Sequence, residues 1–271
     1  MKEPIVLRRR KHPSWVLVQT EEMGYKLQSK LSIETQPINT KHLFEQLCTE
    51  SKLLEGWLEV KKNRGTSGID GQTIGSFKTE LHEEIRQLKE ELESWLYTPQ
   101  PVRRVEIPKP DGSVRHLGIP CVRDRVVQTT LKQLIEPILE GLFSPNSYGF
   151  RPGRNQRQAV EAAQKIVASG KNYIVDIDLS KFFDRVNQDR LVSKLSNLIE
   201  DKRIIRLIGK TLRSGVMQEG MIMATKEGTV QGSPLSPLLS NLVLDELDKE
   251  LEIRGLEYCR FADGTPVQAW N

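Results

Sequence analysis

The chain has 271 residues, of which 37% are hydrophobic and 28% charged, and its formal net charge is +4. This composition is typical of a soluble protein with one or two domains. No apolar run approaches the roughly 18 residues that cross a bilayer, so the sequence excludes a membrane-spanning helix.

The basic residues are unevenly distributed along the chain. Residues 101–160 hold ten Lys and Arg against five Asp and Glu, whereas the rest of the chain sums to −1. A local basic excess of this kind attracts a phosphate backbone. It is equally compatible with a solvated surface, so charge alone leaves both interpretations open.

The cysteines and the N-terminal residues indicate the compartment. Cys48, Cys121 and Cys259 are widely spaced and lack a metal-ligand pattern. The first arginines follow a short apolar patch, which is the reverse of the order in a secretory signal. We therefore predict a cytoplasmic protein.

The N-terminal third is predicted to be helical after an irregular start. Residues 1–38 have weak periodicity, which predicts a poorly ordered leader. A helical pattern begins at Thr40 and reaches the glycine-rich segment RGTSGIDG at 64–71. A second amphipathic helix is predicted over about 76–96 and ends before Pro99.

The middle of the chain mixes extended and helical patterns. The segment VRRVEIPKPDGSVRHLGIP at 102–120 has two extended runs around an Asp-Gly turn, which predicts a β-hairpin. Helices are predicted over about 122–140 and 156–168, the second capped by Asn155.

The C-terminal part is predicted to alternate strands and helices. A strand at 173–180 precedes two helices, and GVMQEGMIMATKEGTVQG is predicted to form a hairpin. A long helix starts near Pro237, and EYCRFAD at 257–263 is a final short strand. The predicted fold class is α+β, with helices packed around an antiparallel sheet.

Three aspartates lie in or beside apolar strands. Asp176 and Asp178 are two residues apart, so their side chains are expected on one face of the strand. Asp263 repeats the situation in the final short strand. Buried carboxylates need a partner or a metal, and two such strands side by side would form a hard-cation site. Each aspartate taken singly also fits a solvated residue at a strand end.

Several motifs together resemble a known family. The segments DLSKFFD at 178–184, TVQGSPLSPLLSN at 229–241 and RFAD at 260–263 resemble the palm motifs of reverse transcriptases. GTSGIDG, RRVEIPKPDGSVRHLGIP, SYGFRPGRN and VMQEG resemble the reverse transcriptase–maturases of bacterial group II introns, and the resemblance covers roughly 40–263. It implies an RNA-directed DNA polymerase with right-hand fingers and palm. Its implied parts are a leader (1–38), N-terminal helices and fingers (39–170) and a palm (171–271).

The resemblance implies a two-metal site. Asp178, which precedes LSKFFD, and Asp263 would be the catalytic ligands of Mg²⁺ in nucleotidyl transfer. Asp176 is not the matching residue, and Asp184 is expected to order the strand-to-helix turn rather than to bind metal.

The resemblance also implies substrate contacts. Lys109 and Arg115 would hold the triphosphate, and the Phe183 ring would exclude a 2′-OH. Gln231 and Gly232 would lie against a base pair or sugar. From the residues alone, these positions would be hairpin charges, a core phenylalanine and a turn.

The implied partners are an intron RNA template, a DNA primer and deoxynucleoside triphosphates. Arg151 and Arg154 are expected to contact template phosphates, because A-form RNA is bound through its backbone and shape.

The sequence departs from the family at its end. The last palm motif has Gly264 where the family has a second Asp, and TPVQAWN does not resemble an apolar return strand. We expect a C-terminally truncated fragment without a thumb that extends primers little or not at all, even after Gly264→Asp. The alternatives are a non-catalytic intron-RNA-binding module and an unstable remnant.

Overall fold

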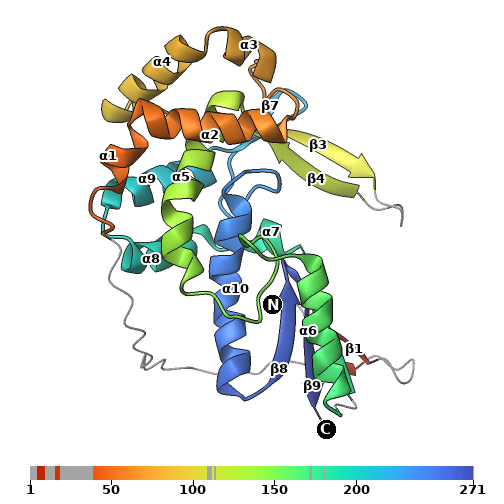
Figure 1. Cartoon of the computed structure of the whole chain (residues 1–271). Helices are drawn as coiled ribbons and strands as arrows, with labels where there is room; N and C mark the ends of the chain where they lie inside the picture. Colours follow the sequence, from red (N-terminus) through yellow and green to blue (C-terminus); the bar gives the residue numbers. More distant parts are fainter. Residues whose placement is uncertain are drawn as a thin grey trace. The chain divides into compact units, whose positions relative to one another are not determined.

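The computed structural model describes residues 5–9, 16–18, 39–108, 112, 114–170, 173–179 and 181–270. Within these ranges the structure describes only the backbone at residues 5–9, 16–18, 173–174, 178 and 264–270. The chain forms two compact units, which Figure 1 shows in cartoon form. The first unit comprises Met1–Asn39, Ser144–Ser180 and Leu244–Asn271, and the second comprises Thr40–Phe143 and Lys181–Val243. The expected parts follow the chain in order, whereas each observed unit gathers separate segments.

The second unit is mainly helical. Its helices are α1 (Leu43–Leu47), α2 (Glu50–Asn63), α3 (Ile74–Thr79), α4 (Leu81–Glu93), α5 (Val122–Glu140), α7 (Phe182–Arg185), α8 (Gln188–Leu198), α9 (Lys202–Leu212) and residues 236–243 of α10 (Ser236–Ile253). The helical pattern after Thr40 is divided into α1 and α2, because the Thr49 side chain accepts a hydrogen bond from the Lys52 backbone and starts a new helix. The pattern predicted over 76–96 is likewise divided, into α3 and α4.

The core of the second unit is built around α5. Along this helix Val122, Val126, Leu131 and Ile135 are fully buried. Helix α2 crosses it closely at Gly56, where an added Cβ would overlap the Thr130 side chain. A glycine is therefore required for the two helices to approach this far.

A four-stranded sheet completes the second unit. Its strand order is β4 (Val114–Ile119), β3 (Val102–Pro108), β6 (Val216–Gln218) and β7 (Met221–Met223). Both predicted hairpins are confirmed, since β3–β4 and β6–β7 are antiparallel pairs. The parallel pairing of β3 with β6, which joins the two hairpins, was not predicted from the sequence.

The first unit contains a five-stranded sheet. Its order is β2 (Val16–Val18), β1 (Ile5–Arg9), β5 (Tyr173–Asp178), β9 (Gly264–Trp270) and β8 (Glu257–Phe261), and all its pairings are antiparallel. Helix α6 (Gln156–Ala168) lies beside β8 (Figure 1). Asn155 caps α6, as predicted, in a reciprocal pair of hydrogen bonds with Gln158.

One expectation about this sheet is wrong. The segment after Asp263 was expected to be too polar for a return strand, yet β9 pairs with both β5 and β8. Backbone hydrogen bonds to two neighbours stabilise a strand whatever its side-chain polarity, which explains the difference. The expected poorly ordered leader, residues 1–38, lies mostly outside the described residues and stays a prediction, although β1 and β2 fall within its range and β1 pairs with β5.

The described residues also bear on membranes and on redox chemistry. No helix in the described ranges combines the length and apolarity that crossing a membrane requires. The three cysteine thiols are free and buried. Burial raises the pKa of Cys48 to about 12 and the pKa of Cys121 and Cys259 to about 11, so these thiols are protonated at neutral pH.

Asp124 provides a test of the second unit's core. It is buried in α5, where it accepts hydrogen bonds from the Tyr97 hydroxyl (2.6 Å) and the Gln100 backbone N–H (3.0 Å). Burial raises the pKa of Asp124 from 3.8 to about 6, against the lowering effect of these hydrogen bonds. The folded state therefore holds this proton more tightly than the unfolded state does.

We expect Asp124→Asn to flatten the dependence of stability on pH. The Asp124 contribution is fully present below the unfolded pKa and is lost as pH rises through about 6. Between about pH 4 and pH 7, the unmodified chain should lose on the order of 2–3 kcal/mol more than the variant. Urea unfolding across this range measures the difference, and parallel pH profiles would contradict the prediction.

Candidate active site

The candidate metal-binding residues lie at one end of the first unit's sheet. Strands β8 and β9 form a hairpin in which Phe261 pairs with Gly264, so Ala262 and Asp263 form the turn. Asp263 was expected within a strand but lies in this turn, where it is partly exposed. Ala262 adopts a positive φ of 57°, which a non-glycine residue adopts rarely and at some strain.

Strand register places Asp178 beside this turn. Asp178 pairs with Gly264 across the β5–β9 ladder, so its backbone is adjacent to that of Asp263. The side chain of Asp178 lies outside the description, and the facing of the two carboxyl groups stays a prediction. Asp176 lies on the same strand, and its buried Oδ1 has no hydrogen-bond partner among the described residues. A buried carboxylate oxygen without a described partner is compatible with a cation or a water molecule at this position.

A buried ion pair stabilises the turn. Arg260 is 1% exposed and donates from Nε (2.8 Å) and Nη2 (2.6 Å) to the two carboxylate oxygens of Asp248 on α10. Its Nη1 donates to the Ala262 carbonyl (2.7 Å) in the turn. Burial raises the pKa of Asp248, and the bidentate contact with Arg260 opposes that rise.

The loop before α6 packs against the same turn. The Tyr148 backbone N–H donates to the Arg260 carbonyl (2.9 Å), and the Ser147 hydroxyl accepts from Arg260 Nη2 (2.6 Å). A Cβ on Gly149 would overlap the backbone of Ala262, so only glycine allows this approach. The SYGF motif therefore packs against the Asp263 turn and stabilises it.

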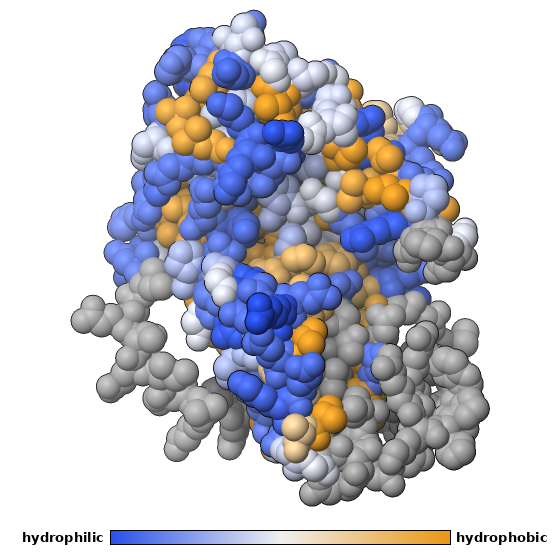
Figure 2. Space-filling view, turned by 45° about the vertical axis from the view of Figure 1, so that its right-hand side comes forward, coloured by the Kyte–Doolittle hydropathy of each residue, from blue (hydrophilic) through white to orange (hydrophobic). Residues whose placement is uncertain are grey.

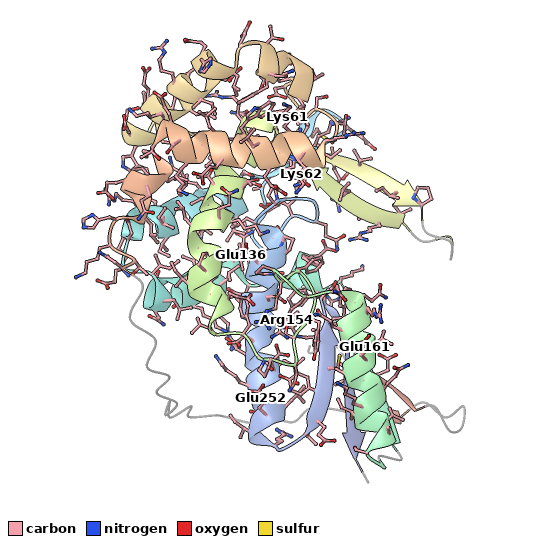
Figure 3. The ribbon with its side chains drawn as sticks, viewed as in Figure 1. Lys61, Lys62, Glu136, Arg154, Glu161 and Glu252 are labelled. Atoms are coloured by element: carbon pink, nitrogen blue, oxygen red, sulfur yellow. The ribbon has the colours of Figure 1, made fainter. Side chains whose placement is uncertain are left out.

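The arginines of the SYGFRPGRN motif bind carbonyl groups of their own loop. Arg151 is 8% exposed, and its guanidinium donates to the carbonyls of Ser144 and Ser147. Arg154, labelled in Figure 3, donates to the Pro145 and Ser147 carbonyls and lies over the Tyr148 ring at 5.2 Å. Arg151 thus stabilises the loop through main-chain oxygens, and the expected contacts of Arg151 and Arg154 with template phosphates stay predictions.

Three of the expected substrate-binding residues come together in the second unit. Arg115 on β4 donates from Nε to Gln231 Oε1 at 2.9 Å. The Gln231 carbonyl accepts from the Gly118 backbone N–H (2.7 Å), and a Cβ on Gly232 would overlap the Gly118 carbonyl. The QGSP segment is therefore fixed against the β3–β4 hairpin. Lys109 lies outside the described residues.

The aromatic pair after β5 is also in the second unit. Phe183 is 5% exposed and contacts Phe182 edge-on, with ring centroids 5.6 Å apart. The Phe183 carbonyl accepts a hydrogen bond from the Thr229 backbone N–H (2.7 Å). Thr229 lies two residues before Gln231. Phe182 packs against the hydrophobic core. The exclusion of a 2′-OH by Phe183 stays a prediction.

Sequence reasoning missed the residues that support the site. These are Arg260, Asp248, Ser147 and the buried Gln188, whose amide donates to the Leu212 and Gly228 carbonyls. One signal was available, because an arginine within the strand EYCRF needs a buried partner.

The antiparallel sheet, with an aspartate at the end of its central strand beside an aspartate in the neighbouring hairpin turn, defines a polymerase palm. The chain belongs to the reverse transcriptase (RNA-dependent DNA polymerase) family, and the sequence model of this family matches residues 107–268. Families of this kind use divalent metal ions. Among the described residues no cluster of three or more possible metal ligands occurs.

The relatives identify the group II intron type within this family. The chain is 39% identical to protein YkfC of Escherichia coli (strain K12) over 199 residues, which cover 72% of this chain and 52% of YkfC. It is 34% identical over 193 residues to the group II intron-encoded protein LtrA of Lactococcus lactis subsp. cremoris, covering 71% of this chain and 32% of LtrA. The chain thus spans about half of the length of YkfC and about a third of the length of LtrA.

A solved structure supports the fold. A chain of a partial Cas6-RT-Cas1–Cas2 complex superposes with a TM-score of 0.56 over 94% of this chain and 42% of that chain. Their sequences are 22% identical, so this likeness concerns the fold alone.

We expect Arg260→Met to destabilise the chain strongly. It would leave Asp248 buried without its partner, which costs about 3–5 kcal/mol. Adding Asp248→Leu should recover much of that loss, because the unpaired charge is then removed as well. Chemical denaturation of the single and double variants measures both effects.

Arg254→Met is the matched control. Arg254 pairs with Glu250 at the surface, where the removal of an ion pair costs less than about 1 kcal/mol. Equal losses of stability in Arg254→Met and Arg260→Met would show that the buried pair has no special role.

Proposed function

We propose that this chain carries the fingers and palm of an RNA-directed DNA polymerase of the group II intron type. Its substrates would be an intron RNA template, a DNA primer and deoxynucleoside triphosphates. The observation that carries the proposal is the β5–β9–β8 register, in which Asp178 is adjacent to the Asp263 turn.

Asp178 and Asp263 are the proposed ligands of Mg²⁺. When bound, such ions stabilise the attacking and leaving oxygens of nucleotidyl transfer. The protein's own contribution would be orientation. Arg260 fixes the turn that carries Asp263, and in the second unit Arg115 donates a hydrogen bond to Gln231.

The remaining residues of the proposed site would select and position substrate. Arg115, with Lys109, would neutralise triphosphate charge, Gly232 would allow close approach to a base pair, and Phe183 would exclude a ribose. Arg154 is partly exposed and is, with Arg151, a candidate for a template-phosphate contact.

One observation favours a second candidate, a module that binds intron RNA without chemistry. Gly264 stands where the family has a second aspartate, so the turn offers less negative charge to hold cations. The formation of β9 weakens this alternative, because the strand that follows Asp263 is present and paired on both sides.

We expect metal-directed cleavage to map the proposed ligands. With Fe²⁺ in place of Mg²⁺ and with hydrogen peroxide and ascorbate added, hydroxyl radicals formed from the peroxide should cut the backbone near residues 178 and 263, and excess Mg²⁺ should suppress both cuts. Asp178→Asn should abolish them, whereas Asp184→Asn, which removes the same charge from the exposed start of α7, should not. Unchanged cleavage in Asp178→Asn would exclude Asp178 as a ligand.

Primer extension on an RNA template tests the activity. We expect slow Mg²⁺-dependent extension that Asp178→Asn lowers by roughly a hundredfold or more, the size of effect that follows the loss of direct transition-state stabilisation. RNA binding without extension, in both the unmodified chain and Gly264→Asp, would instead support the non-catalytic module.

A further inference from the structure

Helix α9 carries a row of cations along one side. Lys202, Arg206 and Lys210 are spaced four residues apart, and Arg213 follows three residues later, so all four fall on one face of the helix. They line a groove of about 590 Å³ together with Thr98, Pro99, Val192, Ile205, Gly209 and Ser214. The opposite face of α9 is buried in the core through residues such as Ile204 and Ile208.

Three of these cations have no carboxylate partner among the residues that the structure describes. No described carboxylate lies within 4.0 Å of the charged groups of Lys202, Arg206 or Lys210, whereas Arg213 pairs with Asp189 at 2.6 Å. The ammonium groups of Lys202 and Lys210 instead donate to the carbonyls of Ser196 and Tyr97, each at 3.0 Å. Their positive charge is therefore available to an anion from outside.

Helix α4, by contrast, carries cations that are neutralised locally. Arg86 pairs with Glu83 and Glu90, and Lys89 pairs with Glu93. This is the usual arrangement for a solvated helix face. The absence of such pairs for Lys202, Arg206 and Lys210, within the part of the chain that is described, distinguishes the α9 face from an ordinary surface.

An aromatic residue fixes the central cation. The Arg206 guanidinium lies 5.0 Å from the centroid of the Trp95 ring, and Lys210 lies 5.7 Å from it. On its other side Trp95 stacks on Phe44, with centroids 4.9 Å apart and the planes 3° from parallel. A cation held over an aromatic ring loses less conformational freedom when it binds a phosphate.

The spacing of the cations suits an extended polyanion. A helix rises about 1.5 Å per residue, so residues four apart are separated by about 6 Å along its axis. Gly209 is buried on the same helix, and an added Cβ there would lie 3.1 Å from Arg213 Nη1, so a larger residue would disturb the last cation of the row.

We propose that the α9 face, defined as Lys202, Arg206, Lys210 and Arg213 with Trp95 beneath them, binds the phosphodiester backbone of RNA. The choice of RNA over other polyanions rests on the proposed function. The surface itself is additional to the triphosphate and template residues named above and involves none of them. It gives the protein a second RNA contact, set by charge and not by base identity.

The test compares two triple variants of the whole chain. One carries Lys202→Gln, Arg206→Gln and Lys210→Gln, and the control carries Lys78→Gln, Arg86→Gln and Lys89→Gln on α3 and α4. Both lose three positive charges from the second unit's surface, but the control cations include the locally paired ones. The probe is a fluorescently labelled RNA hairpin, and its affinity is measured by anisotropy across a range of salt concentrations.

We expect the α9 variant to bind RNA at least tenfold more weakly at low salt. Its plot of log affinity against log salt should be shallower by about two to three, since each lost phosphate contact lowers the slope by about one. The control variant should match the unmodified chain. Identical affinity and slope in the two triple variants would overturn the proposal.

Two further measurements identify the ligand and separate this proposal from the catalytic one. A DNA hairpin of the same sequence should also lose affinity in the α9 variant, because the contact is set by phosphate charge, and a loss confined to DNA or to an acidic peptide would overturn the assignment to RNA. Asp178→Asn should retain the salt slope of the unmodified chain, and the α9 variant should retain Fe²⁺ cleavage near residues 178 and 263. Failure of either proposal is thus visible without the other.

Discussion

The buried ion pair between Arg260 and Asp248 is the constraint around which the first unit is arranged. Two charges taken out of water are tolerated only where their geometry is good and their remaining hydrogen-bonding groups are satisfied. Arg260 meets both conditions, since it binds both oxygens of Asp248, the Ala262 carbonyl and the Ser147 hydroxyl. One side chain therefore ties α10, the loop before α6 and the turn that carries Asp263 to one another.

This arrangement explains how a strained turn is maintained. Ala262 has a positive φ, which an alanine adopts only when its surroundings determine it. Its carbonyl is held by Arg260, and its backbone is covered by Gly149. The aspartate that follows is thereby set by packing behind the turn, although Asp263 itself is partly exposed. On the face of the molecule shown in Figure 2, hydrophilic residues predominate and apolar residues form separate patches.

The elements that sequence predicted well are those whose signals are local. Helix α5 and helix α6 were predicted at their observed bounds, because periodicity, an Asn155 cap and a preceding proline are all encoded within a few residues. The break between α1 and α2 was missed, since one capping threonine interrupts a continuous apolar pattern. Pairings between distant segments, such as β3 with β6, cannot be predicted from the sequence of either strand alone. The same reason applies to the site. Asp178 and Asp263 were proposed from motifs, whereas the part played by Arg260 depends on Asp248 and Ser147, which only the fold brings to it.

The central position of β5 has a consequence for biosynthesis. Its neighbours in the sheet are β1, from the beginning of the chain, and β9, from residues 264–270. Both pairings close long loops, and the entropy of closure must be offset before either contact stabilises the sheet. During translation the segment around Asp178 leaves the ribosome well before β9 exists, so an incomplete sheet edge is presented for that interval. The helical second unit, whose segments end at residue 243, can form its core earlier. The Asp263 turn thus acquires its structure later than the core of the second unit.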